Sequence, residues 1–498
     1  MDQAAIVTQT TPGSPGTQDY TSGSITETVK AAILLFGHST TDGANTAHAA
    51  IGIGFWANDG DAGSESFGGV YGLALNGRTT TTFSRDFQGL NEIVTAELDA
   101  TPLIDVDITA ISAISGGIRI TFSTTSATIK LTVVILAGLS RAYHSAIATT
   151  TTLTHENAGS TTQFRPDCLV LFGCESGFAL PKDDLNIALG FKIDGGSQVG
   201  AGIKIEDGTD PTDADGRVDS DNCAYINPVA DALQATTHTI DATGYDHQLT
   251  TGTGSPDTGV LCLKFSGDVQ LAADNVAIAA SGASQSISVG FQPILVIGMA
   301  TLLAAEDTTT SDSTVSAVGL FAFTSSAARA YTASHQIQAV INASTPSVAT
   351  SRQDDKALLM LDHTGTVVWE ATATMTSTGF DLSFSTRTSA GFITFLAIGA
   401  GNLTSILAET ERISDGTFLN LVKYLSLTET VRIVDGLGGT ILADGLSFLG
   451  PRGFVFQPRV EVGEVAQVGS QQGLVFRSLA EAGEVVQPSA EAGAVGSG

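Results

Sequence analysis

The sequence predicts an all-β fold: three tandem β-sandwich or jelly-roll-like units with extended N- and C-terminal arms. Composition gives the first reason. Thr, Ser, Gly and Ala dominate the 498 residues, with 55 glycines, and no long stretch holds the i, i+3, i+4 apolar spacing of an amphipathic helix. The second reason is a set of short apolar strands that recurs three times along the chain.

Each repeat opens with a short apolar run that ends at a glycine. The runs read KAAILLFG at Lys30–Gly37, FRPDCLVLFG at Phe164–Gly173 and FQPILVIG at Phe291–Gly298. Runs of this length are too short for a core helix and are typical of a strand buried on both faces. Pro166 and Pro293 stand where such strands begin, and a missing N–H costs a strand least at that position.

Two further features repeat in each unit. A second apolar strand carries a mid-strand glycine with a phenylalanine shortly after it, at Ala49–Trp56, Asn186–Ile193 and Ser316–Phe323. An expected hairpin then closes each unit at Gly138, Gly267 or Gly399, and its alternating residues have the period of half-buried antiparallel strands. The period of about 125 to 135 residues matches a whole domain. The sequence leaves open whether the units form a pseudo-threefold body or follow one another like beads.

The predicted domains follow from these repeats. They are an N-terminal arm at 1–28, β-sandwich units at 29–148, 164–280 and 291–402, a linker at 149–163, and a C-terminal β-repeat arm at 403–498. The first segment is rich in Thr, Ser, Gly and Pro, so a disordered leader is the alternative to an ordered arm.

The C-terminal region contains two short duplications. ETERISDG from Glu409 returns as ETVRIVDG from Glu429, and GFVFQPRVEVGEV from Gly453 returns as GLVFRSLAEAGEV from Gly473. Both copies are spaced by 20 residues. Such strand-turn repeats suit an arm that adds strands to a neighbour's sheet edge.

The charge balance limits which classes of partner the protein is expected to bind. The chain has 22 Lys and Arg residues against 51 Asp and Glu residues, a formal net charge of -29. This argues against a nucleic-acid partner and against anionic membranes, and it is compatible with divalent cations and basic partners. No apolar run approaches the ~18 residues that cross a bilayer, so we expect no membrane insertion. The first residues lack the basic and apolar regions of a secretory signal, so none is expected.

The densest acidic stretch is DGTDPTDADGRVDSDN at Asp207–Asn222. Within it, DADG at Asp213–Gly216 resembles part of a calcium loop, in which alternating carboxylates converge on one hard cation. The first ligand is out of register, and no helix flanks the stretch as in an EF-hand. We therefore weigh an irregular calcium site against a solvated loop. The candidate metal ligands are Asp210, Asp213, Asp215, Asp219 and Asp221.

The sequence singles out no catalytic group. It has no HExxH zinc motif, no GxSxG nucleophile elbow and no GxxxxGK[ST] phosphate loop. Surface or loop positions are expected for the eight histidines, which are His38, His48, His144, His155, His238, His247, His335 and His363. No Cys-His cluster suggests zinc, so free buried thiols are expected for Cys168, Cys174, Cys223 and Cys262.

Two alternatives to a purely structural role stay open. Trp369, in the expected strand VVWEATATM, is either a core aromatic or a platform on which a sugar ring stacks. The second reading predicts a glycan-binding surface adhesin or receptor-binding module, with a host-surface glycan as partner. A polysaccharide-degrading enzyme is the further alternative, because paired carboxylates meet only in three dimensions.

In composition and organisation the chain resembles structural proteins of tailed bacteriophage particles. The shared features are an acidic Thr/Gly/Ala-rich composition, tandem β-sandwich units, extended termini and the lack of a signal peptide. The resemblance implies a non-enzymatic virion component of tail, fibre or capsid-decoration type. Such a protein would be made in the host cytoplasm and would assemble as a homo-oligomer with other virion proteins. No functional residue is carried over.

Overall fold

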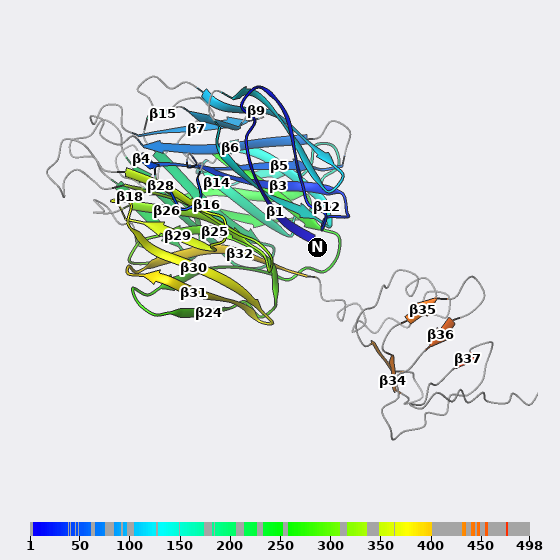
Figure 1. Cartoon of the computed structure of the whole chain (residues 1–498). Coiled ribbons are helices and arrows are strands. Elements are labelled where there is room, and N and C mark those ends of the chain that lie inside the picture. The colour runs from blue at the N-terminus through cyan, green and yellow to red at the C-terminus, as the bar shows by residue number, and fades with distance from the viewer. Residues whose placement is uncertain are drawn as a thin grey trace, which may run out of the picture. The chain divides into compact units, whose positions relative to one another are not determined.

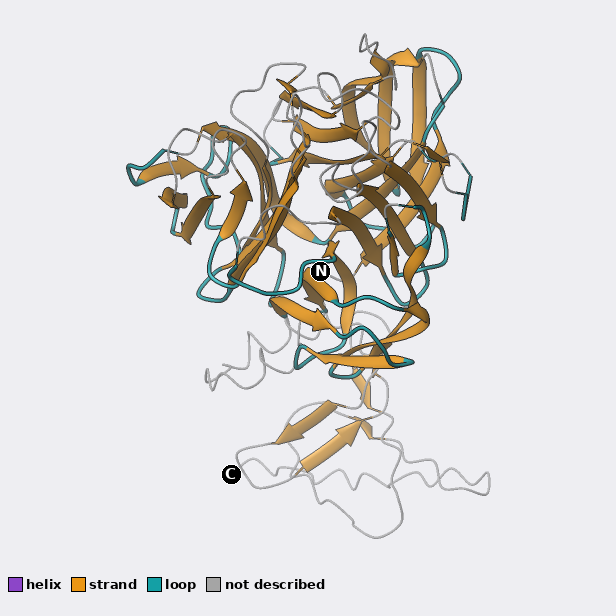
Figure 2. Cartoon of the chain, turned by 90° about the vertical axis from the view of Figure 1, so that its left-hand side faces the viewer, coloured by secondary structure: helices purple, strands orange, loops and turns teal. Residues whose placement is uncertain are grey.

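The computed structural model is all-β, as the sequence predicts, with strands and turns but no helix among its described residues (Figure 1; Figure 2). No described helix is long and apolar enough to span a membrane. The structure describes residues 3–400 with gaps, and five short strands between Val431 and Phe476. The longest gaps within 3–400 are 75–83, 97–103, 174–181, 206–213, 227–232, 309–315 and 336–347. The chain divides into two compact parts, Met1–Ile406 and Leu407–Gly498.

In Met1–Ile406, one arrangement of ten strands occurs three times. Each repeat has a large sheet in the order first, tenth, third, fourth, fifth, sixth and a small sheet in the order second, ninth, eighth, seventh. The first repeat consists of β1 (Gln3–Thr10), β2 (Gly16–Thr21), β3 (Val29–Gly37), β5 (Ala49–Asn58), β6 (Glu65–Ala74), β7 (Ser84–Leu90), β8 (Ile93–Ala96), β9 (Ile104–Ile114), β10 (Gly117–Thr125) and β11 (Lys130–Ala137).

The other two repeats follow directly along the chain. The second consists of β12 (Leu139–Ala148), β13 (Thr154–Asn157), β14 (Cys168–Gly173), β16 (Leu185–Ile193), β17 (Gln198–Ile205), β18 (Ala214–Asp219), β19 (Cys223–Ile226), β20 (Leu233–Ile240), β21 (Gly244–Thr251) and β22 (Asp257–Phe265). The third consists of β23 (Leu271–Ile278), β24 (Ser284–Ser288), β25 (Pro293–Thr301), β26 (Ser316–Phe323), β27 (Ala328–His335), β28 (Val348–Gln353), β29 (Leu358–Leu361), β30 (Val367–Thr376), β31 (Gly379–Arg387) and β32 (Gly391–Gly399).

The two sheets of each repeat enclose an apolar core of their own. In the first repeat, Leu34 and Phe36 on β3 belong to one buried cluster with Ile111 of β9 and Ile120 of β10. The third repeat has a corresponding core around Phe380, and the second repeat has one around Leu171 and Tyr245. Each repeat is therefore a two-layer sandwich.

A fourth apolar core joins the three repeats. On each third strand, the residues that alternate with those of the sandwich core belong to one shared cluster. These residues are Ile33 and Leu35 on β3, Val170 and Phe172 on β14, and Ile297 and Met299 on β25. The large sheets are thus buried on both faces, which explains the unbroken apolar runs of their sequences. Because one core contains residues of all three repeats, they pack side by side and do not follow one another like beads.

The loop after the third strand ties each repeat to the sixth strand of another. In the first repeat, β4 (Thr46–Ala47) pairs with β28 of the third repeat, and β15 (Lys182–Asp183) of the second pairs with β7 of the first. The third repeat completes the ring, since the N–H of Asp307 donates to the carbonyl of Val218 on β18 at 2.8 Å. The sixth strand of each large sheet, which would otherwise be an open edge, thereby contacts a neighbouring repeat.

The predicted boundaries need correction. Residues 1–28 are no arm, because β1 pairs with β11 and β2 with β10 inside the first sandwich. The expected linker 149–163 contains β13, an edge strand of the second small sheet. The ends of the expected units 29–148 and 164–280 contain β12 and β23, which are the first strands of the following repeats.

The part Leu407–Gly498 contains β33 (Val431–Val434) and β34 (Thr440–Ala443) as one pair, and β35 (Leu446–Phe448), β36 (Phe454–Phe456) and β37 (Val475–Phe476) as one sheet. The two copies of the second duplication are neighbours there. Val455 pairs in parallel with Val475, and Phe456 with Phe476. Equivalent residues thus stack at the spacing of the duplication, as in a repeat array. The copy at 409–416 of the first duplication lies outside the described residues.

The shared core is expected to hold the body together. Phe172 is fully buried, and its ring centroid lies 4.9 Å from that of Phe55 in the first repeat. Phe172→Ala should lower the free energy of unfolding by about 3–5 kcal/mol, because it removes a large side chain from a packed core. Urea denaturation followed by tryptophan fluorescence measures this loss. Leu153→Ala, at a side chain that is 61% exposed, is the control and should change little; equal losses would contradict the assignment.

The contact of Asp307 with β18 offers a second test. Its carboxylate accepts hydrogen bonds from the N–H and the hydroxyl of Ser220, at 2.8 and 2.7 Å, and its backbone has a φ of 56°. Asp307→Ala should cost about 1–3 kcal/mol and speed amide hydrogen exchange in β18. Asp221→Ala is the control, since that exposed carboxylate makes no hydrogen bond among the described residues. Unchanged hydrogen exchange in β18 of the Asp307→Ala variant would show that these hydrogen bonds do not stabilise β18.

Candidate functional site

The structure describes only part of the expected calcium loop. Asp210 and Asp213 lie outside the described residues, and Asp215 is described only in its backbone, where it pairs with Lys204. Asp219 and Asp221 are described, with Asp219 buried and Asp221 exposed. The calcium site therefore stays a prediction.

The contacts of Asp219 give it a structural role. Its Oδ2 accepts a hydrogen bond from Nε of Arg217 at 2.7 Å, and its Oδ1 accepts the N–H groups of Asp221 and Asn222 at 3.0 and 2.8 Å. Its carbonyl accepts Nδ2 of Asn275 in the third repeat at 2.8 Å. The carboxylate thus shapes the end of β18 where the second and third repeats meet.

Trp369 does not provide a platform for sugar stacking. Its side chain is fully buried in the core of the third repeat, and its Nε1 donates to the carbonyl of Ser389 at 2.7 Å. Trp56 is buried in the same way, with Nε1 donating to the carbonyl of Ile111 at 3.0 Å. Both tryptophans are core residues, so the first reading of Trp369 holds and the second is wrong.

The expectation for cysteines is confirmed where it is described: Cys168, Cys223 and Cys262 are buried and free. Cys174 lies outside the described residues. Burial raises the pKa of all three described thiols far above its usual range. They are therefore inert core groups rather than nucleophiles.

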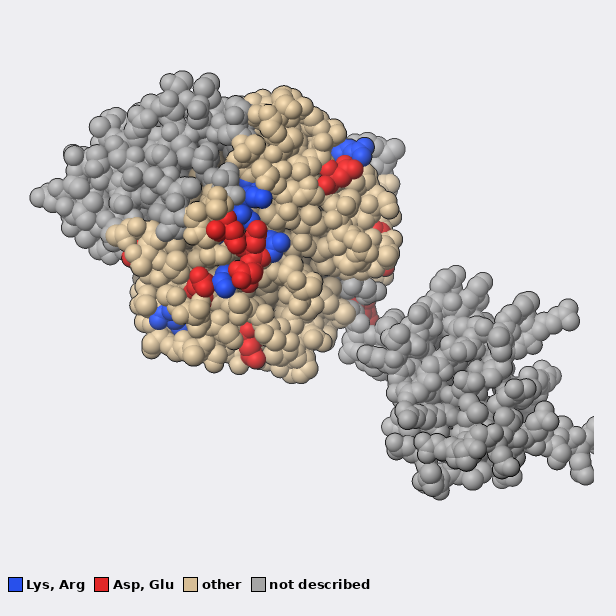
Figure 3. All heavy atoms as spheres, in the orientation of Figure 1, with Lys and Arg blue, Asp and Glu red and all other residues tan. Residues whose placement is uncertain are grey.

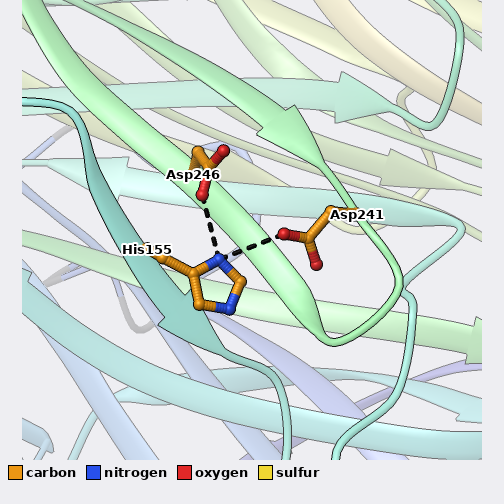
Figure 4. A group of neighbouring side chains, drawn as sticks. All are labelled: His155, Asp241 and Asp246. Atoms are coloured by element: carbon orange, nitrogen blue, oxygen red, sulfur yellow. Dashed lines mark hydrogen bonds and ion pairs between the residues drawn. The ribbon is translucent and has the colours of Figure 1, made fainter.

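One group of three metal-ligating side chains forms within the described part of the chain (Figure 4). His155 lies on the edge strand β13, and Asp246 stands directly opposite it on β21. Asp241 lies in the turn between β20 and β21. The Nδ1 atom of His155 is 2.9 Å from Oδ1 of Asp246 and 3.1 Å from Oδ2 of Asp241. One ring nitrogen thus faces two carboxylates.

The turn that carries Asp241 fixes the direction of its carboxylate. Oδ1 accepts the N–H groups of Thr243 and Gly244 at 2.7 and 2.9 Å, which leaves Oδ2 for His155. Burial favours the neutral form of Asp241, but these hydrogen bonds outweigh it and lower its pKa. The hydrogen bond to Asp246 raises the pKa of His155, and the charge of Asp241 adds to this. The two carboxylates thus favour a positive charge at this imidazole.

The first and third repeats have different residues at the cross-strand position of His155 and Asp246. In the first repeat, Arg119 on β10 faces Asp19 on β2, and Nε and a terminal nitrogen donate to the two carboxylate oxygens at 2.6 and 2.8 Å. In the third repeat, Asp381 faces Ser286. The place therefore carries a charged cross-strand pair in two repeats, and only the second repeat adds another carboxylate.

Three histidines contradict the expectation of surface or loop positions, whereas His155 is exposed as expected. His144, His238 and His247 are all buried. His238 and His247 face each other across β20 and β21, with ring centroids 6.3 Å apart. The related cross-strand pairs are apolar: Ile111 with Ile120 in the first repeat and Ala373 with Leu382 in the third.

The ring nitrogens of these histidines make few hydrogen bonds. Neither ring nitrogen of His238 or His144 has a hydrogen-bond partner among the described residues, and Nε2 of His247 lies 3.4 Å from Oε1 of Glu156. His144 on β12 packs against both Phe55 and Phe172, where the first and second repeats meet. Burial lowers the pKa of His144 and of His238 to about 3. Only an internal alignment of the repeats could have revealed these positions.

Comparison with known proteins adds no further guide to function: no protein family, curated protein or solved structure matches the chain.

The buried histidines predict an acid-labile second repeat. The unfolded chain takes up protons below the ordinary histidine pKa of 6.5, whereas His238 and His144 do so only near pH 3. The free energy of unfolding is therefore unaffected by these two histidines above pH 6.5. It falls as the pH drops from 6.5 toward 3, by about 1.4 kcal/mol per pH unit for each histidine. Urea denaturation midpoints between pH 7 and pH 4.5 measure this slope.

A double variant carrying the residues of the third repeat provides the matched test. His238→Ala together with His247→Leu should flatten the pH dependence and leave the remainder to His144. A slope equal to that of the unchanged protein would show that the buried pair does not cause the acid sensitivity.

Proposed function

We propose that the protein is a non-enzymatic structural component of a virus particle, of tail, fibre or capsid-decoration type, that acts through assembly. The observation that carries this proposal is the ring of three related sandwiches around one apolar core. A body with three similar outer faces suits a position of threefold symmetry in a larger assembly.

The surface chemistry supports a protein partner over nucleic acid. On the face in Figure 3, basic and acidic side chains lie together in a mixed patch, without a continuous basic field. Several described basic groups are paired with carboxylates, as Arg329 is with Asp354 at 3.3 Å and Lys264 with Asp167 at 2.5 Å. Paired cations have little charge left for phosphates. Copies of this chain and other virion proteins are the partners we propose.

The alternative of a glycan-binding adhesin loses the residue that motivated it, since Trp369 is buried. For the alternative of a polysaccharide-degrading enzyme, the described residues show no pair of carboxylates in a cleft. Assembly therefore remains the function that the structure supports best.

The mass of the purified protein in solution tests the proposal. Light scattering in calcium and in chelator should give a discrete oligomer, and the protein should co-sediment with particles purified from an infected host. Dissociation in chelator would favour a cation at an interface, such as the acidic loop Asp207–Asn222. A monomer in both buffers that never sediments with particles would contradict a structural virion role.

A further inference from the structure

We propose that His155, Asp241 and Asp246 form a binding site for one divalent transition-metal ion of the zinc class. The ligand atoms are Nδ1 of His155, Oδ2 of Asp241 and Oδ1 of Asp246. All three lie within 4.8 Å of one another. The site is independent of the proposed function, because it lies in the small sheet of the second repeat alone.

The spacing of the ligand atoms fits such an ion. Zinc binds nitrogen and carboxylate oxygen at about 2.0–2.2 Å, so neighbouring ligands around it lie roughly 3.0–3.5 Å apart. The observed distances from Nδ1, 2.9 and 3.1 Å, are within a few tenths of an ångström of that spacing. Side chains that are 32–39% exposed leave room for water at the remaining position.

The ligand set selects the class of metal. An imidazole nitrogen with two carboxylates suits zinc and its neighbours in the first transition row. Calcium takes six to eight oxygen ligands and has no use for the ring nitrogen, so this cluster is distinct from the calcium site predicted at Asp207–Asn222. Thr243 Oγ1 lies 3.2 Å from Nε2 of His155 and helps to orient the ring, as outer-shell partners of metal-bound histidines do.

Charge supplies an independent reason. In the first repeat, one guanidinium, that of Arg119, neutralises one carboxylate, that of Asp19. In the second repeat, two carboxylates face one imidazole, which is cationic only while it is protonated. Arg165, whose charge also acts on Asp241, is held by Asp194 through hydrogen bonds of 2.6 and 2.8 Å. A divalent ion would balance both carboxylates at a pH where the imidazole is neutral.

A bound ion would fasten the edge of the second small sheet. β13 has four residues and pairs only with β21 in its sheet. The ion would link this short strand to β21 and to the turn before it, which lie more than 80 residues further along the chain. Acid would release the ion, because protons compete for Nδ1.

Calorimetric titration of the full-length, chelator-treated protein with ZnCl₂ at neutral pH tests the site. We expect a binding event of one ion per chain that is lost in His155→Ala and in Asp246→Asn and is weakened at pH 5. CaCl₂ should not compete. Asp381→Asn, the related position in the third repeat, is the matched control and should bind as the unchanged protein does.

A second readout distinguishes this cluster from other histidines. Cobalt(II) should give a visible absorption band in the unchanged protein and in Asp381→Asn, but not in His155→Ala. Circular dichroism of each variant should confirm the β fold, so that lost binding is not lost folding. The absence of zinc binding, or the same binding in His155→Ala as in the unchanged protein, would overturn the proposal.

Discussion

Burial of the large sheets on both faces is the constraint on which the rest of the structure depends. A strand that lies between two apolar layers is apolar at most of its positions, which is why β3, β14 and β25 lack the alternation of ordinary antiparallel strands. One sandwich alone would expose the outer face of its large sheet to water. The three repeats bury these faces against each other, and their loops cover the sixth strands. The repeats therefore stabilise one another, and the body of residues 1–406 is expected to unfold as a unit.

Much of this could be predicted from the sequence, and the misses share a physical cause. The third, fourth and last strands of each repeat are buried on both faces, so their apolar runs are plain. β1 and β2 are edge strands that consist mostly of Thr, Gln, Ala and Gly, and many of their residues are only partly buried. An edge strand needs backbone pairing more than apolar side chains, so QAAIVTQT and GTQDYT resemble a disordered leader. The cluster at His155 was missed because its members come from a short edge strand and from a hairpin far along the chain.

An alignment of the repeats against each other locates what linear spacing hides. The ninth strands begin GIRIT, GYDHQ and GFDLS at Gly117, Gly244 and Gly379. In this register Asp246 corresponds to Arg119 and Asp381, which are exposed and partly exposed, and His247 corresponds to the core residues Ile120 and Leu382. A histidine where its relatives have Ile and Leu is a local departure from the apolar pattern. It distinguishes the second repeat, whose core contains a titratable side chain where the other two repeats have an aliphatic one.

The second repeat combines a sandwich core with buried imidazoles and with the cluster of His155. Below the ordinary histidine pKa, the buried histidines destabilise this repeat, whereas the imidazolium of His155 strengthens its own pairing with Asp241 and Asp246. In the metal-free protein the two effects oppose each other in one sandwich: acid destabilises the core, whereas the imidazolium of His155 stabilises the exposed edge. A chain with three covalently joined repeats can place such titratable groups in only one of them, which a trimer of identical subunits cannot do.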